Sequence, residues 1–217
     1  MQGGDIIESK GSNMTKVLEE KETLPMVINL PPTLEMDEEQ FFEFCRVNSE
    51  LRIERTASGE LIIMPPTGGE TGDRNAELTT QVRLWAKQNG LGVGFDSSTG
   101  FILPNGATRS PDVSWVKRSR LATLTSEQKQ KFLPLCPDFV IELRSPSDSL
   151  AVIKEKMEEY LDNGAELGWL IDAKNRQVYV YRSGSAVECL DNPETLSGEP
   201  LLSGFTLDLR DVWEPDL

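Results

Sequence analysis

Two carboxylates inside apolar segments are the residues best suited to chemistry. Glu142 lies in the run PDFVIELRS (137–145), and Asp112 lies upstream in SPDVSWV. An ionised side chain is costly within a buried strand, so each needs a partner or a function. Two carboxylates at one partly buried place also raise each other's pKa unless a cation compensates. A divalent metal ion meets that need, because hard cations bind carboxylate oxygens together with carbonyl groups and waters.

The segment after Glu142 carries two lysines on a helix predicted over about 149–163. Its buried face consists of Leu150, Ile153, Met157 and Leu161. At about 100° per residue, Lys156 falls at one edge of this face, beside Tyr160, and Lys154 falls at the opposite edge. Lys156 can therefore extend to a site at the end of the sheet, and burial is expected to lower its pKa. It would then orient an attacking water or neutralise charge in a phosphoryl transition state.

Strand alternation determines which of these side chains can meet. In 137–145, Glu142 and Arg144 share one face, and in SPDVSWV the face of Asp112 also carries Ser114. If the two strands pair, Asp112 and Glu142 converge. Each residue also has a structural alternative. Asp112 can cap a turn, Glu142 can pair with Arg144 or a lysine, and Lys156 can be a solvated helix residue. Taken together, the three residues favour a functional site. Exceptions to local sequence rules, such as a charged residue in a buried strand, are expected at functional sites.

The remaining elements indicate an α/β or α+β fold with a mixed central sheet flanked by helices. Asp37 and Gln40 predict a capped helix at 36–50, and 51–66 reads as a hairpin. The strand–helix–strand unit 137–172 is the one crossover among mostly antiparallel connections. The other predicted elements are an extended segment at 24–32, a helix at 67–90, strands within 92–116, a short helix or loop at 124–132 and strands at 167–172 and 176–184. In the tail, Phe205, Leu207 and Leu209 share one face, and Val212 and Trp213 follow.

The amino-acid composition limits the kinds of catalytic and metal site that this chain can form. The 217 residues contain no histidine, which excludes His-ligated zinc and His-assisted nucleophiles, and oxygen ligands favour Mg²⁺ or Mn²⁺. The three scattered cysteines predict a reducing, cytoplasmic setting. No apolar run is long enough to cross a membrane. Residues 1–24 are expected to form a disordered leader, and 25–217 a single domain. The net charge of −14 opposes binding to nucleic acid, unless charge is unevenly distributed.

Three ordered blocks resemble a known family. SPDVSWV, then VIELRSPSDSL, then KEKMEEYLDNGAELGWLID are similar to the Uma-two family of restriction endonuclease-like proteins, within the PD-(D/E)xK nuclease superfamily. The resemblance spans roughly residues 30–210. It implies a restriction-endonuclease-like core and divalent-metal chemistry on DNA.

The resemblance also implies roles for individual residues. Asp112 matches the aspartate of the Pro-Asp motif and Glu142 the second acidic residue, both metal ligands. The usual lysine two positions further on is replaced by Arg144, a poor base that would contact phosphate. Lys156 matches a lysine moved onto the following helix. Glu77 is similar to an extra acidic metal ligand on the preceding helix, although a solvated glutamate is the structural alternative there.

The sequence therefore predicts a Mg²⁺- or Mn²⁺-dependent endonuclease that hydrolyses DNA, with Asp112 and Glu142 holding the metal. The alternative is a catalytically silent binding or assembly module, for instance a homodimer, which the net charge and Arg144 favour. An enzyme acting on another phosphoester is a third option.

Overall fold

A six-stranded mixed sheet forms the centre of the molecule in the computed structural model, which describes residues 26–31, 34–146 and 148–217. The expected leader, residues 1–24, lies outside the described residues. In sheet order the strands are β11 (Glu188–Asp191), β10 (Gln177–Arg182), β9 (Leu167–Asp172), β8 (Phe139–Leu143), β7 (Val113–Lys117) and β4 (Gly92–Asp96). Only β8 and β9 are parallel neighbours. The predicted strand–helix–strand crossover is confirmed, because helix α4 (Leu150–Asp162) connects this pair.

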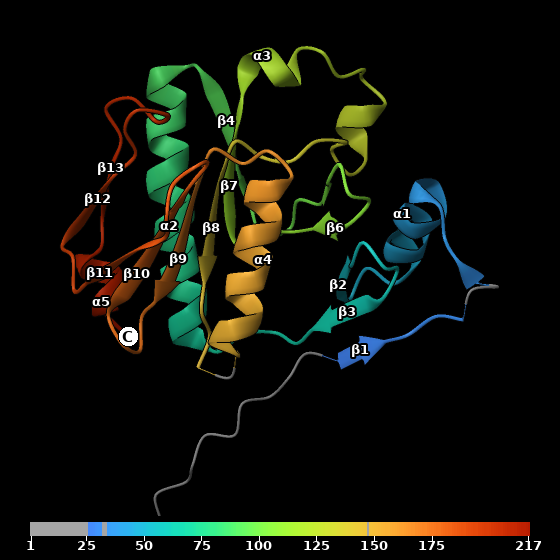
Figure 1. The fold of residues 1–217 in the computed structure, drawn as a ribbon, viewed down its shortest axis with the longest axis horizontal. Coiled ribbons are helices and arrows are strands. Elements are labelled where there is room, and N and C mark those ends of the chain that lie inside the picture. Colours follow the sequence, from blue (N-terminus) through green and yellow to red (C-terminus); the bar gives the residue numbers. More distant parts are fainter. Residues whose placement is uncertain (1–25, 32–33, 147) are drawn as a thin grey trace, which may run out of the picture.

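Two long helices cover opposite faces of this sheet, α2 (Gly69–Asn89) on one and α4 on the other (Figure 1). Strand alternation produces the two faces. Phe139 and Ile141 of β8 belong to the core under α2, and Val140 belongs to the core under α4. The α4 side is filled by Met157 and Tyr160, both fully buried. The even-numbered side chains of β8, including Glu142, therefore point toward α4.

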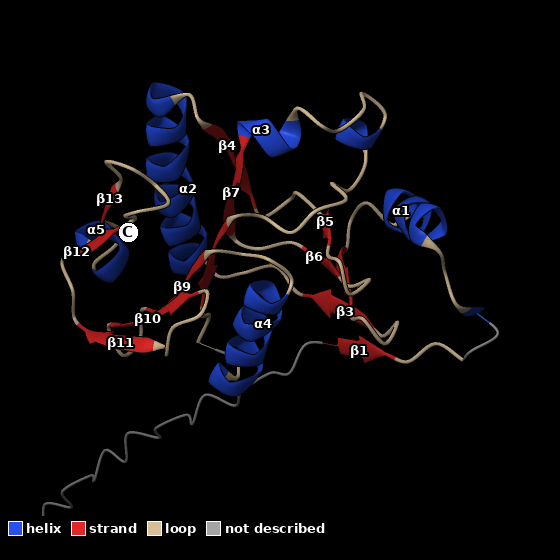
Figure 2. Cartoon of the chain, turned by 45° about the horizontal axis from the view of Figure 1, so that its top comes forward, coloured by secondary structure: helices blue, strands red, loops and turns tan. Residues whose placement is uncertain are grey.

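A second, antiparallel sheet lies on the side of α4 away from α2, together with α1 (Glu38–Val47), as Figure 2 shows. Its order is β1 (Met26–Ile28), β3 (Leu61–Met64), β2 (Arg52–Arg55), β6 (Thr108–Arg109) and β5 (Phe101–Ile102). The predicted hairpin of β2 and β3 is confirmed, as is the capping box of Asp37 and Gln40 on α1. Phe41 of α1 packs on Ile53 and Leu61 in the core of this sheet.

The chain passes from the second sheet to the central sheet within three residues. Strand β6 ends at Arg109 and β7 begins at Val113, so residues 110–112 form a connection that we call the sheet junction. Asp112 is the last residue of this junction.

The remaining elements are short and lie outside the two sheets described above. They are α3 (Arg118–Leu121), the 3₁₀ helix η2 (Gln128–Gln130), β12 (Thr195–Ser197), β13 (Thr206–Asp208) and α5 (Arg210–Trp213). The apolar face predicted near the C-terminus is confirmed, since Phe205, Leu207 and Leu209 are buried in the core under α2. Across the residues that the structure describes, no helix has the length and apolarity to span a membrane.

The packing of Gly92 against the indole of Trp115 predicts opposite effects for two glycine substitutions. A Cβ atom at Gly92 would lie 2.3 Å from the Trp115 ring, whereas one at Gly72 of α2 would meet nothing within 4 Å. Gly92→Ala should lower the free energy of unfolding by about 1–3 kcal/mol through overpacking. Gly72→Ala should raise it by about 0.5–1 kcal/mol, because alanine favours the helix. Urea denaturation measures both, and a Gly92→Ala variant as stable as wild type would contradict this packing.

Candidate active site

Asp112 and Glu142 stand opposite each other on neighbouring strands. Val113 pairs with Ile141 in the antiparallel register of β7 and β8, so the next pair outward is Asp112 with Glu142. Directly opposed Cβ atoms lie about 4.5–5.5 Å apart. The Leu143 N–H donates to Asp112 Oδ2 at 2.9 Å, which fixes that carboxylate across the strands. The convergence predicted from strand alternation is therefore present.

Lys156 lies between two carboxylates. Its Nζ is 2.9 Å from Glu142 Oε1 and 2.9 Å from Glu54 Oε1. The Tyr160 hydroxyl, one helical turn further along α4, donates to the same Glu142 oxygen at 2.9 Å. Lys154 points elsewhere, with its Nζ 3.9 Å from the centre of the Tyr179 ring. The helical phase thus separates the two lysines as the sequence indicated, and it brings Lys156 to Glu142.

Glu54 is a member of this cluster that the sequence analysis missed. Its side chain is 2 % exposed and accepts hydrogen bonds from the Ser110 N–H at 2.9 Å and from Arg109 Nη1 at 3.2 Å, besides its contact with Lys156. The available signal was the one applied to Glu142, an acidic residue inside a predicted strand. Its partners, however, lie 55 to 102 positions away along the chain, and the hairpin alone does not reveal them.

Arg109 joins β6 to α4 at the border of the cluster. Its Nε donates to Glu159 at 2.6 Å, and its Nη1 contacts Glu54. The second sheet is thus anchored to α4 by Arg109–Glu159 and by Lys156–Glu54. These two ion pairs hold the second sheet, and with it the start of the sheet junction at Arg109, close to α4.

Burial and neighbouring charges perturb the acids unequally. Burial raises the pKa of Glu142 to about 7, and the nearby Asp112 and Glu54 add to the rise, while Lys156 opposes it. Burial likewise raises the pKa of Asp112. Burial also acts to raise the pKa of Glu54, but the charges of Lys156 and Arg109 outweigh it and leave that pKa below the ordinary value. Glu142 is therefore a carboxyl whose charge changes near neutral pH.

The expectation of a lowered pKa for Lys156 is wrong. Burial does disfavour the ammonium, yet the negative charges of Glu142 and Glu54 outweigh it and raise the pKa above its ordinary value. Lys156 is a stable cation and not a general base.

Arg144 and Glu77 lie outside this cluster. Arg144 donates from Nη1 to Asp172 at 2.8 Å, at the end of the neighbouring strand β9, and from Nε to the Asp148 carbonyl. Glu77 stands on α2, which covers the other face of the sheet, and accepts a hydrogen bond from Gln81 at 2.8 Å. The structure brings Asp112, Glu142 and Lys156 together as predicted. It adds Glu54 to the cluster, and it places Arg144 and Glu77 outside it.

The donor atoms fit a hydrated Mg²⁺ or Mn²⁺ better than a closed metal cage. Within the described ranges, no three His, Cys, Asp or Glu side chains are arranged to hold an ion. Mg²⁺ typically uses only one or two carboxylates and keeps several waters. Asp112 Oδ1 and Glu142 Oε2 accept no hydrogen bond from any described residue, since the bonds go to the other oxygen of each group. These two oxygens would hold the ion.

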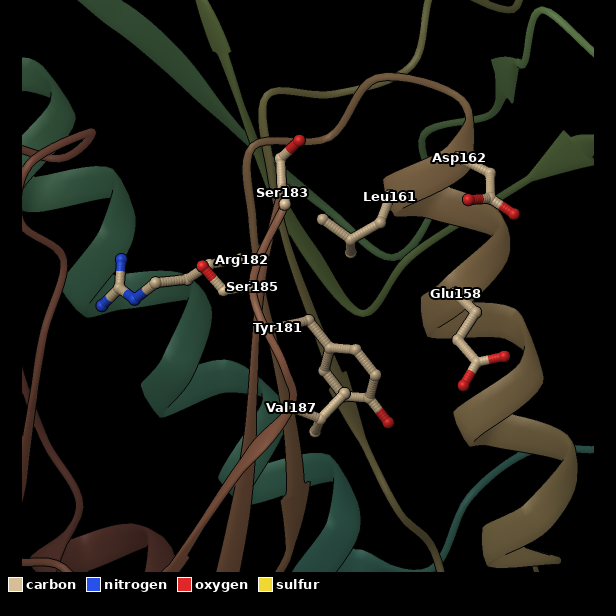
Figure 3. A pocket seen from close by; sticks show the side chains of 9 residues that line it. Glu158, Leu161, Asp162, Tyr181, Arg182, Ser183, Ser185 and Val187 are labelled. Atoms are coloured by element: carbon tan, nitrogen blue, oxygen red, sulfur yellow. The ribbon is translucent and has the colours of Figure 1, made fainter.

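A surface hollow on another side of α4 is separate from this cluster. Figure 3 shows Glu158 and Asp162 of α4 on one side and Tyr181 of β10 on the other. The lining includes none of the residues predicted for the site. Its Glu158 is exposed and on the same helix as Lys156, so it provides a control position.

Comparisons with known proteins identify the family and the fold. The Uma2 (Uma-two) family model, described as "Putative restriction endonuclease", matches residues 38–210. A crystal structure described as a putative nuclease belonging to DUF820, from Anabaena variabilis, is similar with a TM-score of 0.64 and 23 % sequence identity. The match covers 76 % of this chain and 90 % of that one, and it shows the shared fold. Among curated proteins, none matches the chain.

The raised pKa of Glu142 predicts that a neutral replacement stabilises the fold. A carboxyl with a folded-state pKa of about 7 contributes its stability fully below its ordinary value of 4.5 and loses it as pH rises toward 7. Glu142→Gln should therefore exceed wild type in unfolding free energy at pH 8, by on the order of 1–3 kcal/mol, and approach it at pH 5. Urea denaturation at both pH values tests this, with Glu158→Gln as the control. A Glu142→Gln variant that is less stable than wild type at pH 8 would refute the assignment.

Proposed function

This chain belongs to the Uma2 family, and from that premise we propose that it is a divalent-metal-dependent nuclease that hydrolyses phosphodiester bonds of DNA. The observation that carries the proposal is the opposed pair Asp112 and Glu142, with Lys156 bonded to Glu142. Each of these two carboxylates has one oxygen that accepts no hydrogen bond from a described residue, and Lys156 supplies a fixed cation beside them. Such a group is suited to an ion and a phosphate group.

The proposed cofactor is Mg²⁺, or Mn²⁺. When bound, such an ion supplies a polarised phosphoryl oxygen and a water of lowered pKa. Asp112 would hold it through Oδ1, with the Leu143 N–H keeping the other oxygen in place. Glu142 would hold it through Oε2, and the Tyr160 hydroxyl and Lys156 fix its Oε1. Glu54 is not a proposed ligand, because Lys156, Arg109 and a backbone N–H already occupy its oxygens.

Lys156 is proposed to stabilise charge. Its ammonium remains protonated between Glu54 and Glu142, so it can offset negative charge that develops on the phosphoryl oxygens but cannot accept a proton. Its side chain is 15 % exposed, and that of Asp112 is 13 % exposed, so both reach the surface of the cluster. A phosphate group at the surface of the protein could thus contact them without a deep cleft.

A second candidate is the catalytically silent binding or assembly module. It is favoured by the closed ion-pair network of Lys156 with Glu54 and Glu142, since such networks also serve structural roles. The net charge of −14 points the same way. In that case the homodimer is the proposed form. A cytoplasmic location is proposed for either candidate, because Cys45, Cys136 and Cys189 are free thiols.

Cleavage of plasmid DNA separates the two candidates. The wild-type protein should nick supercoiled plasmid with Mg²⁺ or Mn²⁺, and EDTA should abolish the reaction. Asp112→Asn and Glu142→Gln should each lower the rate by about 100-fold or more while remaining folded, because each removes a metal-binding charge. Glu158→Gln, exposed on the same helix as Lys156, should keep the wild-type rate. A folded wild-type protein that cleaves neither double- nor single-stranded DNA with either metal would favour the silent module.

Protons and metal ions should compete for Glu142. Its pKa of about 7 predicts that the cleavage rate rises with pH and falls about tenfold per unit on the acid side, where the protonated carboxyl holds a cation poorly. Because metal binding displaces the proton, a tenfold increase in subsaturating Mg²⁺ should move the midpoint toward lower pH by up to about one unit. Rates measured across pH 5–9 at several Mg²⁺ concentrations test this. A midpoint that does not move with Mg²⁺ would argue against Glu142 as a ligand.

A further inference from the structure

We infer that Arg52 binds a phosphate of the DNA backbone beside the Asp112–Glu142 pair, an inference that rests on the proposed function. Arg52 and Glu54 are two residues apart on β2, so their side chains leave the same face of the second sheet. Glu54 reaches the acidic cluster from that face. Arg52 is directed to the same place and approaches Asp112.

The guanidinium of Arg52 is incompletely bonded. Its Nη2 is 4.0 Å from Asp112 Oδ1, which is too long for a hydrogen bond. Its Nε is buried and has no hydrogen-bond partner among the described residues. A buried donor without a partner carries a desolvation penalty, and a phosphate oxygen would relieve it. The side chain is nevertheless 35 % exposed, so an anion can reach it from solvent.

Arg109 and Arg144 also lie near the acidic cluster, but each is already paired with a carboxylate. Arg109 donates to Glu54 and Glu159, and Arg144 donates to Asp172 and to a backbone carbonyl. The sequence pattern had assigned phosphate contact to Arg144, because it stands where the family motif has a lysine. The geometry moves that role to Arg52, whose loosely held guanidinium lies next to a proposed metal ligand.

The chemistry of the group fits a phosphodiester. A guanidinium offers planar, paired donors that match two oxygens of one phosphate, and it stays charged at any physiological pH. Its position beside Asp112 places a positive charge next to the acidic cluster. A chain with a net charge of −14 needs such a local positive charge to approach the DNA backbone. Contact with phosphate alone carries no base information, so Arg52 would support binding irrespective of sequence.

Binding of a fluorescent double-stranded oligonucleotide, followed by anisotropy with Ca²⁺ in place of Mg²⁺, tests the inference. Arg52→Gln should weaken binding by about 10- to 100-fold, and Arg52→Lys should recover part of it. Arg46→Gln is the control, because it removes the same charge from α1, where the partner of Arg46 among the described residues is the exposed Glu43. It should change affinity less than about twofold. Thermal unfolding should show that Arg52→Gln is folded.

The outcomes separate this inference from the proposed function. If wild type binds metal and cleaves DNA while Arg52→Gln matches Arg46→Gln in affinity and KM, the inference is wrong and the nuclease stands. If wild type cleaves nothing, the proposed function fails, and oligonucleotide binding alone decides the role of Arg52. A wild-type protein that does not bind the oligonucleotide also overturns the inference. A selective loss of affinity in the Arg52→Gln variant supports it.

Discussion

The ammonium of Lys156, held between Glu54 and Glu142, is the contact on which the arrangement of this protein depends. Glu54 comes from the second sheet, Glu142 from the central sheet, and Lys156 from the helix between them. One buried cation thus fixes three elements relative to each other. Removing Lys156 would leave two buried carboxylates without their shared cation, which typically costs about 3–5 kcal/mol. The Arg109–Glu159 pair adds a second link between the second sheet and α4, next to the sheet junction that ends at Asp112.

The same contact divides the chemical roles. Lys156 and Arg109 keep Glu54 ionised, so Glu54 acts as an anchor. Burial of Glu142 outweighs the opposing charge of Lys156, so the pKa of Glu142 is about 7 and its charge changes near neutral pH. The Tyr160 hydroxyl and Lys156 bind one oxygen of Glu142 and leave the other available. Glu54 and Glu142 are therefore two neighbouring glutamates with different roles. Glu54 is a structural anchor and Glu142 a candidate metal ligand, because their surroundings differ.

The sequence predicted what local periodicity can encode. Alternation placed Glu142 on the α4 face of β8, and the helical phase separated Lys156 from Lys154. Periodicity could not reveal Glu54, because its contact with Lys156 joins residues 102 positions apart and depends on how the two sheets meet. It also could not foresee that Asp172, brought beside Arg144 by the parallel register of β8 and β9, would engage that arginine. The pKa of Lys156 was mispredicted for the same reason, since the second carboxylate was unknown.

The central claim is that Asp112 and Glu142 together hold a divalent cation, and calorimetric titration tests it most directly. Titrating Mn²⁺ and then Mg²⁺ into wild-type protein at pH 8 should give a saturable isotherm. Asp112→Asn and Glu142→Gln should each abolish it, and Glu158→Gln, a substitution at an exposed glutamate of the same helix, should leave it unchanged. Absence of saturable binding in the wild-type protein, or equal binding in the Glu142→Gln variant, would contradict the account.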